Sequence, residues 1–77
     1  MSIKVRYFAS LSEKAGKSES DMAVSRTLKV SEVWRLDTGG IAMPDNLLAA
    51  VNMEYADLEA QVYDGDEVAF FPPVTGG

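Results

Sequence analysis

The stretch DGDEVAFFPPVTGG, residues 64–77, contains a turn, a strand and a stiff tail in succession. Residues 64–66 predict the turn, because Asp hydrogen-bonds to its own backbone and Gly takes a positive φ without steric cost. Aromatic and β-compatible side chains predict a strand over residues 67–71. Pro72 and Pro73 end the strand pairing, since neither has a backbone N–H to donate. The segment therefore predicts a strand followed by a projecting tail.

The tail beyond this strand is predicted to be slim and extended, with a charge at its tip. Gly76 and Gly77 have no Cβ, so they fit a narrow channel. The double proline stiffens the base in an extended form, and a terminal carboxylate is ionised at neutral pH. We expect a folded domain over residues 1–73 and a flexible tail over residues 74–77 that enters another protein's active site. The alternative is a chance glycine pair or an inert end.

Two other segments carry a family resemblance together with this tail. Residues 47–52 read LLAAVN, and residues 3–9 read IKVRYFA. With residues 64–77, they closely resemble the small, sulfur-carrying subunit of molybdopterin synthase, a ubiquitin-like family. Residues 17–46 agree with it only in general pattern. The resemblance implies a β-grasp fold: a mixed sheet packed on one main helix, with a short helix after the first strand and with the first and last strands adjacent and parallel.

Composition limits the chemistry that the chain can perform. Cysteine and histidine are both absent from the 77 residues. Their absence argues against disulfides, the usual zinc sites, thiol nucleophiles and Ser-His or Cys-His catalysis. We therefore expect no metal site and no bound cofactor. A sulfur carrier of this composition could carry sulfur only at its chain terminus.

Charge is divided unevenly along the sequence. The net charge is −5, with seven basic and five acidic side chains in residues 1–38 and seven acidic side chains but no basic one in residues 39–77. Nucleic acid is an unexpected partner, because its phosphates need a basic footprint. A basic protein groove is the expected partner of the tail-bearing half. No apolar run is long enough to span a membrane and no leader pattern is present, so we expect a cytoplasmic protein.

The first elements are predicted from alternation and from capping residues. Residues 3–8 predict a strand in which alternate side chains face the core: Ile3, Val5 and Tyr7. This assignment leaves Phe8 on the polar face. Ser10 and Glu13 predict a capping box that begins a short helix, and Gly16 provides its left-handed exit.

The next elements are a strand over residues 21–25 and the main helix over residues 30–38. The strand is expected to turn two side chains inward, Met22 and Val24. The helix has an apolar stripe flanked by Leu36 and made of Val30, Val33 and Trp34. Further strands are predicted at residues 47–51, 53–56 and 67–71. Strands packed on one main helix give an α+β fold.

The last strand predicts a docking patch. Val68 and Phe70 share the face that we assign to the helix, so Ala69 and Phe71 point to the open face. The parallel pairing implied by the resemblance brings Phe8 beside Phe71, and exposed aromatic clusters commonly mark binding sites. We predict that the partner-binding residues follow the patch into the tail: Phe8, Ala69, Phe71, Pro72, Pro73, Val74 and Thr75. The alternative is that a loop covers one of the aromatic rings.

The resemblance implies the chemistry of the tail. A ubiquitin-activating-like adenylyltransferase would use ATP to adenylate the carboxylate of Gly77, and sulfur attack would then give a thiocarboxylate. Gly76 would let the terminus reach the pocket of the large synthase subunit, where the sulfur forms the dithiolene of molybdopterin. The two subunits would form a heterotetramer. This chain would be a co-substrate, so the word enzyme would apply to the complex.

Three alternatives remain open from the residues themselves. The chain could carry sulfur for thiazole or cysteine synthesis, although the double proline favours the molybdopterin branch. It could be a ubiquitin-like modifier joined to protein lysines through Gly77. It could also be a plain interaction domain with an inert tail. The covalent state of the terminus distinguishes these possibilities.

Overall fold

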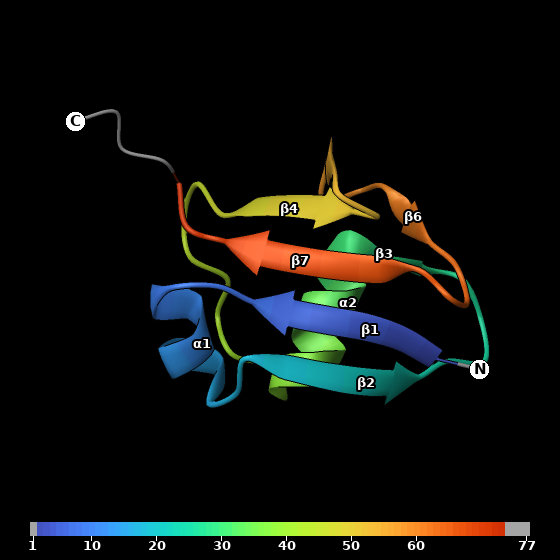
Figure 1. The fold of residues 1–77 in the computed structure, drawn as a ribbon, viewed down its shortest axis with the longest axis horizontal. Helices are drawn as coiled ribbons and strands as arrows, with labels where there is room; N and C mark the ends of the chain where they lie inside the picture. The colour runs from blue at the N-terminus through green and yellow to red at the C-terminus, as the bar shows by residue number, and fades with distance from the viewer. Residues whose placement is uncertain (1, 74–77) are drawn as a thin grey trace.

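The computed structural model describes residues 2–73, which form a mixed five-stranded sheet with the main helix across one face (Figure 1). The sheet order is β2-β1-β7-β4-β5, and a separate two-stranded ribbon pairs β3 with β6. The elements in chain order are β1 (Ser2–Tyr7), α1 (Ser10–Ala15), β2 (Glu19–Ala23), β3 (Leu28–Lys29), α2 (Val30–Thr38), β4 (Leu48–Val51), β5 (Glu54–Ala56), β6 (Gln61–Val62) and β7 (Glu67–Phe71).

Strands β1 and β7 lie side by side at the centre of the sheet and run parallel. Lys4 pairs with Glu67 and Tyr7 with Phe70 in this register. All other pairings in the sheet are antiparallel. The expected adjacency of the first and last strands is therefore confirmed. Because β7 runs between β1 and β4, the tail begins at the middle of the sheet rather than at an edge (Figure 1).

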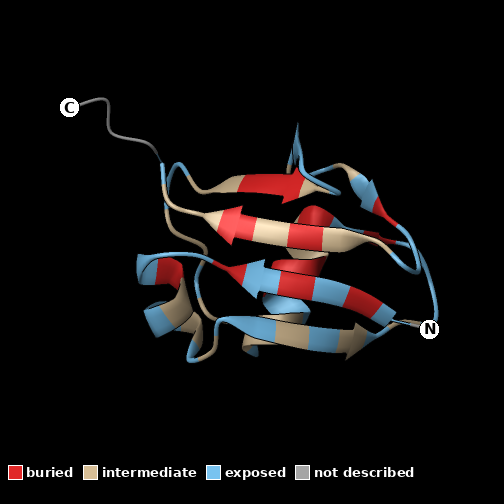
Figure 2. Cartoon of the chain, in the orientation of Figure 1, coloured by how far each residue is buried: buried red, intermediate tan, exposed pale blue. Residues whose placement is uncertain are grey.

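The core lies between the sheet and α2, and it follows the alternation in the strands (Figure 2). The predicted inward residues of β1 and β7 are all buried, and so is the predicted helix stripe: Ile3, Val5, Tyr7, Val30, Val33, Trp34, Val68 and Phe70. Leu36 is 49% exposed and lies outside the core. Three rings pack together at its centre, with Trp34 edge-on to Tyr7 at 5.8 Å and to Phe70 at 5.2 Å.

A buried carboxylate fixes the end of α2 to the sheet. The side chain of Asp37 is 7% exposed and accepts hydrogen bonds from the Tyr7 hydroxyl at 2.5 Å and the Ser20 hydroxyl at 2.8 Å. Lys17 completes its surroundings, with Nζ 3.4 Å from Oδ2. Burial of the phenol, together with its hydrogen bond to Asp37, raises the pKa of Tyr7 well above its ordinary value.

Both helices end as predicted, and α2 also begins at Val30 as predicted, but the start of α1 differs. Gly16 and Gly39 both take left-handed φ values at the helix ends, 79° and 76°. The predicted capping box at Ser10 is wrong: Ala9 holds the cap position and makes no side-chain hydrogen bond. The backbone turns sharply at Ala9, with φ 52° and ψ −132°, so Ser10 is already helical. The corresponding bond occurs at α2 instead, where the Lys29 N–H donates to Glu32 Oε1 at 3.0 Å.

Four strand predictions also need correction. The first strand begins and ends one residue earlier than expected, at Ser2 and Tyr7. The second strand begins and ends two residues earlier than expected, so Val24 follows β2 while still packing against the core with Met22. The ribbon of β3 and β6 was not predicted, because each strand has only two residues and no alternation to detect. Strands β4 and β5 each begin one residue later than predicted, and their ends at Val51 and Ala56 are as predicted. Within residues 2–73, no helix has the length and apolarity needed to cross a membrane.

Candidate functional site

The candidate site lies on the open face of the sheet, beside the point where β7 ends. Phe71 is the last residue of β7, Pro72 is half-buried and Pro73 is exposed. Four of the predicted site residues, Val74, Thr75, Gly76 and Gly77, lie outside the described residues. The structure therefore places the root of the tail and leaves its predicted chemistry as a prediction.

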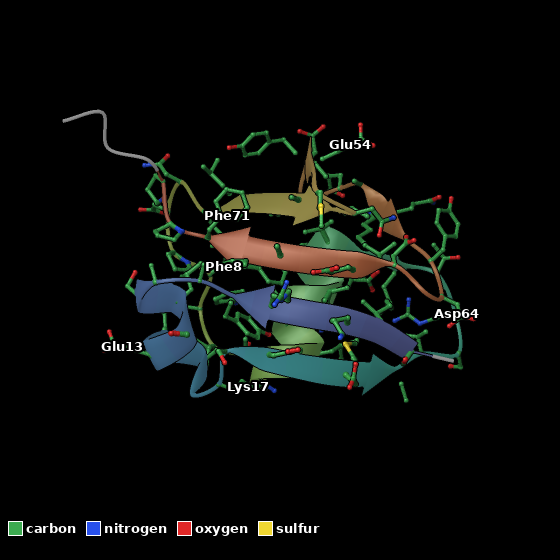
Figure 3. The ribbon with its side chains drawn as sticks, viewed as in Figure 1. Phe8, Glu13, Lys17, Glu54, Asp64 and Phe71 are labelled. Atoms are coloured by element: carbon green, nitrogen blue, oxygen red, sulfur yellow. The ribbon has the colours of Figure 1, made fainter. Side chains whose placement is uncertain are left out.

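The three residues of the predicted docking patch come together in one hollow. Phe8, Ala69 and Phe71 all line a surface hollow of about 340 Å³. Figure 3 shows Phe8 and Phe71 near one another at the end of the sheet where β7 stops. The Phe8 N–H donates to the carbonyl of Phe70 at 3.0 Å, which continues the β1–β7 pairing by one residue. Phe8 is 45% exposed, so its ring is available to a partner.

The hollow also contains residues that the sequence did not point to. They come from β1, β4, the β4–β5 turn, β5 and β7: Arg6, Ala50, Met53, Tyr55 and Glu67. Pairing explains the position of two of them, because Ala50 lies opposite both Tyr55 and Ala69 and so shares their face. The rings of Tyr55 and Phe71 are 5.7 Å apart. Alternation along the β4–β5 hairpin could have indicated that these two residues face the hollow, but only if the register of the two strands had been known.

Comparison with known proteins assigns the chain to a family. The ThiS family model matches residues 5–77. The chain belongs to the ThiS family. The molybdopterin synthase sulfur carrier subunit of Escherichia coli K12 is 40% identical over 80 residues, which cover 97% of this chain and 99% of that protein. This relative is a member of the subunit family that residues 3–9, 47–52 and 64–77 resemble.

Solved structures confirm the β-grasp fold of this ThiS-family chain. SAMP1 from Haloferax volcanii superposes with a TM-score of 0.80 at 28% identity, covering all of both chains, and is also described as small archaeal modifier protein 1. A structure of the complex of subunits 1 and 2 of molybdopterin-converting factor from Helicobacter pylori matches with a TM-score of 0.65 at 22% identity. The match covers 100% of this chain and 100% of the matched chain, and it shows a similarity of fold alone.

One wall of the hollow in this ThiS-family chain is a turn with unusual backbone geometry. Asn52 and Met53 both have positive φ, 52° and 70°, in the two-residue turn between β4 and β5. Such a turn favours Asn followed by Gly. Asn52 is held there because its side chain donates to Asp66 at 3.1 Å and accepts from the Glu67 N–H at 3.0 Å. Met53 is 89% exposed and occupies the position where glycine has the lowest cost.

The two charged side chains of the hollow are paired with each other. Arg6 Nη1 lies 3.3 Å from Glu67 Oε2, and the Arg6 guanidinium carbon lies 5.9 Å from the centre of the Phe8 ring. Beyond the hollow, Lys4 and Glu19 are 3.8 Å apart. Among residues 2–73 no group of three or more acidic side chains is placed to hold a metal ion. Apart from Arg6 and Glu67, the lining is apolar or aromatic, which suits it to binding an apolar surface.

Proposed function

We propose that this ThiS-family chain is a sulfur carrier that serves molybdopterin synthase in the cytoplasm. The observation that carries the proposal is the motif of residues 64–77 on a chain 40% identical, over nearly its full length, to a molybdopterin synthase sulfur carrier subunit. The lack of cysteine and histidine supports it, because no side chain offers a thiol for sulfur. The terminus at Gly77 is then the proposed carrier.

The chemistry at the terminus begins with activation. The carboxylate oxygen of Gly77 attacks the α-phosphorus of ATP and displaces pyrophosphate, which gives an acyl-adenylate. A sulfide-level sulfur donor then attacks the acyl carbon; a C–S bond forms, the C–O bond to AMP breaks, and a thiocarboxylate remains. An adenylyltransferase of the ubiquitin-activating type binds the ATP in this scheme, and the carrier itself binds no cofactor.

The large synthase subunit is the proposed receiver of the sulfur. It supplies the pocket for the pterin precursor and the acid–base groups of the reaction. Phe8, Ala69 and Phe71 dock on it, with Pro72 and Pro73 directing the segment 74–77 toward the pocket. This chain acts there as a co-substrate that positions its terminus, so catalysis belongs to the complex.

A protein modifier is the second candidate function. The observation that favours it is the similarity to SAMP1, which has 28% identity and a TM-score of 0.80 and is described as a modifier protein. In that case Gly77 would form an isopeptide bond with a lysine of another protein. Both candidates begin with an activated terminus, so they differ in the product rather than in the fold.

Intact mass spectrometry distinguishes the candidates. The purified chain is incubated with ATP, an adenylating enzyme of this type and a sulfur source. The expected result is a mass gain equal to exchanging one oxygen for one sulfur, located in the Gly77 peptide. A ladder of higher-mass protein adducts would favour the modifier instead.

Two tail variants make this experiment specific. Deletion of Gly77 and the substitution Gly76→Leu should both abolish sulfur transfer while leaving thermal unfolding unchanged. Sulfur transfer at the normal rate by the Gly77-deleted chain would refute the proposed carrier site. The same mass gain on a wild-type chain that never transfers sulfur to the large subunit would point to another acceptor.

A further inference from the structure

The hollow beside the root of the tail has a floor of two small side chains and walls of large ones. Ala50 and Ala69 pair across β4 and β7 and form the floor. Phe8 and Phe71 stand at the end nearest the tail, while Tyr55 and Met53 stand on the β5 side. A large residue at either alanine would fill the space. The small floor therefore creates a recess where a flat sheet face would otherwise lie.

The size and lining of the recess limit what can occupy it. Its volume of about 340 Å³ is at the lower end of the roughly 300–1,000 Å³ found for small-molecule sites. Its two charged side chains, Arg6 and Glu67, already pair at 3.3 Å, so they offer little to orient a polar ligand. The remaining lining is apolar or aromatic. These properties fit one protruding apolar side chain of a protein partner, in the way that interface anchors fill pockets.

The backbone at Met53 supports a binding role for this wall. Its φ of 70° places a methionine where left-handed geometry costs roughly 1–2 kcal/mol for a residue with a Cβ. Strained positions persist mainly where surrounding structure and function maintain them. The thioether is unbranched and adapts its shape to neighbouring groups. An exposed, adaptable side chain at this turn can close over an inserted group.

Charge indicates what surrounds the inserted group. Residues 39–77 contain seven acidic side chains and no basic one. Glu67 and Glu59 form salt bridges with Arg6 and Lys29, and within residues 2–73 the other five acidic side chains of this half form none, so this half keeps a negative charge. That half supplies β4, β5 and β7, which form most of the recess. A partner with basic residues around an apolar protrusion has the complementary charge. Phe71 both lines the recess and precedes Pro72, so such a partner also lies along the root of the tail.

We propose that the recess on Ala50 and Ala69 is the anchor pocket for one large apolar side chain, ringed by basic residues, on the protein that receives the tail. The proposal rests on the proposed sulfur-carrier function and adds to it the specificity feature of the partner. Met53 and Tyr55 form the adjustable wall. Arg6 and Glu67 form the polar rim.

Filling the recess tests the proposal with a matched control. Ala69→Leu and Ala50→Leu should each weaken binding of the large synthase subunit by about 10- to 100-fold in titration calorimetry, the range expected when one large apolar side chain loses its site. Ala23→Leu makes the same change on exposed β2, outside the recess, and should leave affinity unchanged. Thermal unfolding of each variant checks that the sheet is intact.

A second measurement keeps the test independent of the variants' folding. In the complex of the wild-type chain with the large subunit, isotope-filtered NMR should show contacts from the Ala50 and Ala69 methyl groups to one apolar side chain of the partner. Normal affinity of Ala69→Leu, or no such contacts in a formed complex, would overturn the anchor pocket. Contacts to a second copy of this chain would overturn it in favour of self-association.

Failure of the pocket and failure of the carrier function are distinguishable. If the pocket is wrong but the function is right, Ala69→Leu still binds the large subunit normally, and the Gly77 peptide still gains sulfur. If the proposed function is wrong, the wild-type chain does not gain sulfur, whether or not Ala69→Leu changes the affinity for the large subunit.

Discussion

Aromatic rings on consecutive residues of the chain lie on opposite faces of the sheet, yet only one of these faces is covered by a helix. Tyr7 and Phe70 point to α2 and pack with Trp34. Their neighbours in sequence, Phe8 and Phe71, point the other way and line an open hollow. One step along the chain therefore moves a ring from the core, where it contributes to stability, to the open face, where we propose that it contributes to binding a partner. Substitutions on the two faces should separate these two properties.

The closed face also satisfies its polar atoms internally. Trp34 Nε1–H donates to the carbonyl of Ile41 at 2.7 Å, and the Tyr7 hydroxyl donates to Asp37. Among residues 2–73 no fully buried side-chain nitrogen or oxygen lacks a partner. On the open face, the rings of Phe8, Tyr55 and Phe71 line the hollow instead. This contrast gives the following predictions, from the largest expected effect to the smallest.

Neighbouring phenylalanines on opposite faces give the sharpest test. Phe70→Ala should lower the free energy of unfolding by about 3–5 kcal/mol, because it leaves a cavity among buried rings. Phe71→Ala should lower it by only about 1 kcal/mol or less while weakening binding to the large subunit. Urea unfolding and titration calorimetry measure the two quantities. Equal losses of stability would show that the two faces are not separate.

The hydrogen bond between Tyr7 and Asp37 gives a smaller effect on the closed face. Tyr7→Phe should lower the free energy of unfolding by about 1–3 kcal/mol, because a buried carboxylate loses one of its donors. Ser20 and Lys17 still contact Asp37 and limit the loss. Urea unfolding at pH 7 measures this. A Tyr7→Phe chain as stable as wild type would mean that the hydroxyl contributes nothing beyond packing.

The same tyrosine predicts a dependence on alkaline pH. The folded pKa of Tyr7 is raised above the ordinary value of 10.0, so the folded state keeps the proton after the unfolded state loses it. Its contribution is fully present below pH 10 and is lost as pH rises above that value. The free energy of unfolding, measured from pH 8 to pH 11, should fall more steeply for wild type than for Tyr7→Phe. Parallel curves would contradict the assignment.

The wall of the open face offers a stabilising change. Met53→Gly should raise the free energy of unfolding by about 0.5–1 kcal/mol, because the relief of left-handed strain at this position exceeds the extra conformational entropy that glycine loses on folding. It should also weaken docking, since the adjustable wall is removed. Asn52→Gly is the contrasting variant and should destabilise, because it loses two hydrogen bonds to β7 and its turn. Destabilisation by Met53→Gly would show that Met53 packs in the folded chain.

The start of α2 gives the smallest effect. The backbone N–H of Lys29 and then the guanidinium of Arg26 hold the pKa of Glu32 below its ordinary value. The resulting stability is present above the unfolded pKa and is lost as pH falls through the folded pKa. Glu32→Gln should slightly lower the melting temperature at pH 7, with the difference vanishing in acid. Glu54→Gln on β5 is the control, and an equal change there would indicate a general charge effect.

The sequence predicts a helix or strand well where a residue that ends it, such as Gly or Pro, agrees with the pattern of apolar side chains. The limits of α2 are as predicted, since Gly39 ends it, and those of β7 are as predicted, since Pro72 follows it. The alternation of Ile3, Val5 and Tyr7 identified their core face. The entry to α1 could not be found in this way. It depends on a positive φ at Ala9, a residue type that gives no signal of that conformation.

The candidate site was predictable only along the two central strands. Phe8 and Phe71 could be paired because the family resemblance supplied the parallel arrangement. Ala50 enters the hollow from β4 and Tyr55 from β5. Strand β5 has only three residues, and its register against β4 depends on the turn at Asn52. The sequence also does not show that Ala50 and Ala69 form the floor of a pocket. A small side chain leaves a recess only when large side chains surround it, and these neighbours are known only from the structure.

The parallel contact of β1 with β7 joins segments that are synthesised far apart in time. Arg6 and Glu67 meet across 61 residues of chain. A growing chain on the ribosome has β1 long before its central neighbour exists, so the middle of the sheet must close late in folding. Phe8 and Phe71 meet only at that step. A nascent or proteolytically shortened chain without β7 lacks Phe71 and therefore lacks the proposed docking surface, so we expect a partner to bind only after the central strand is in place.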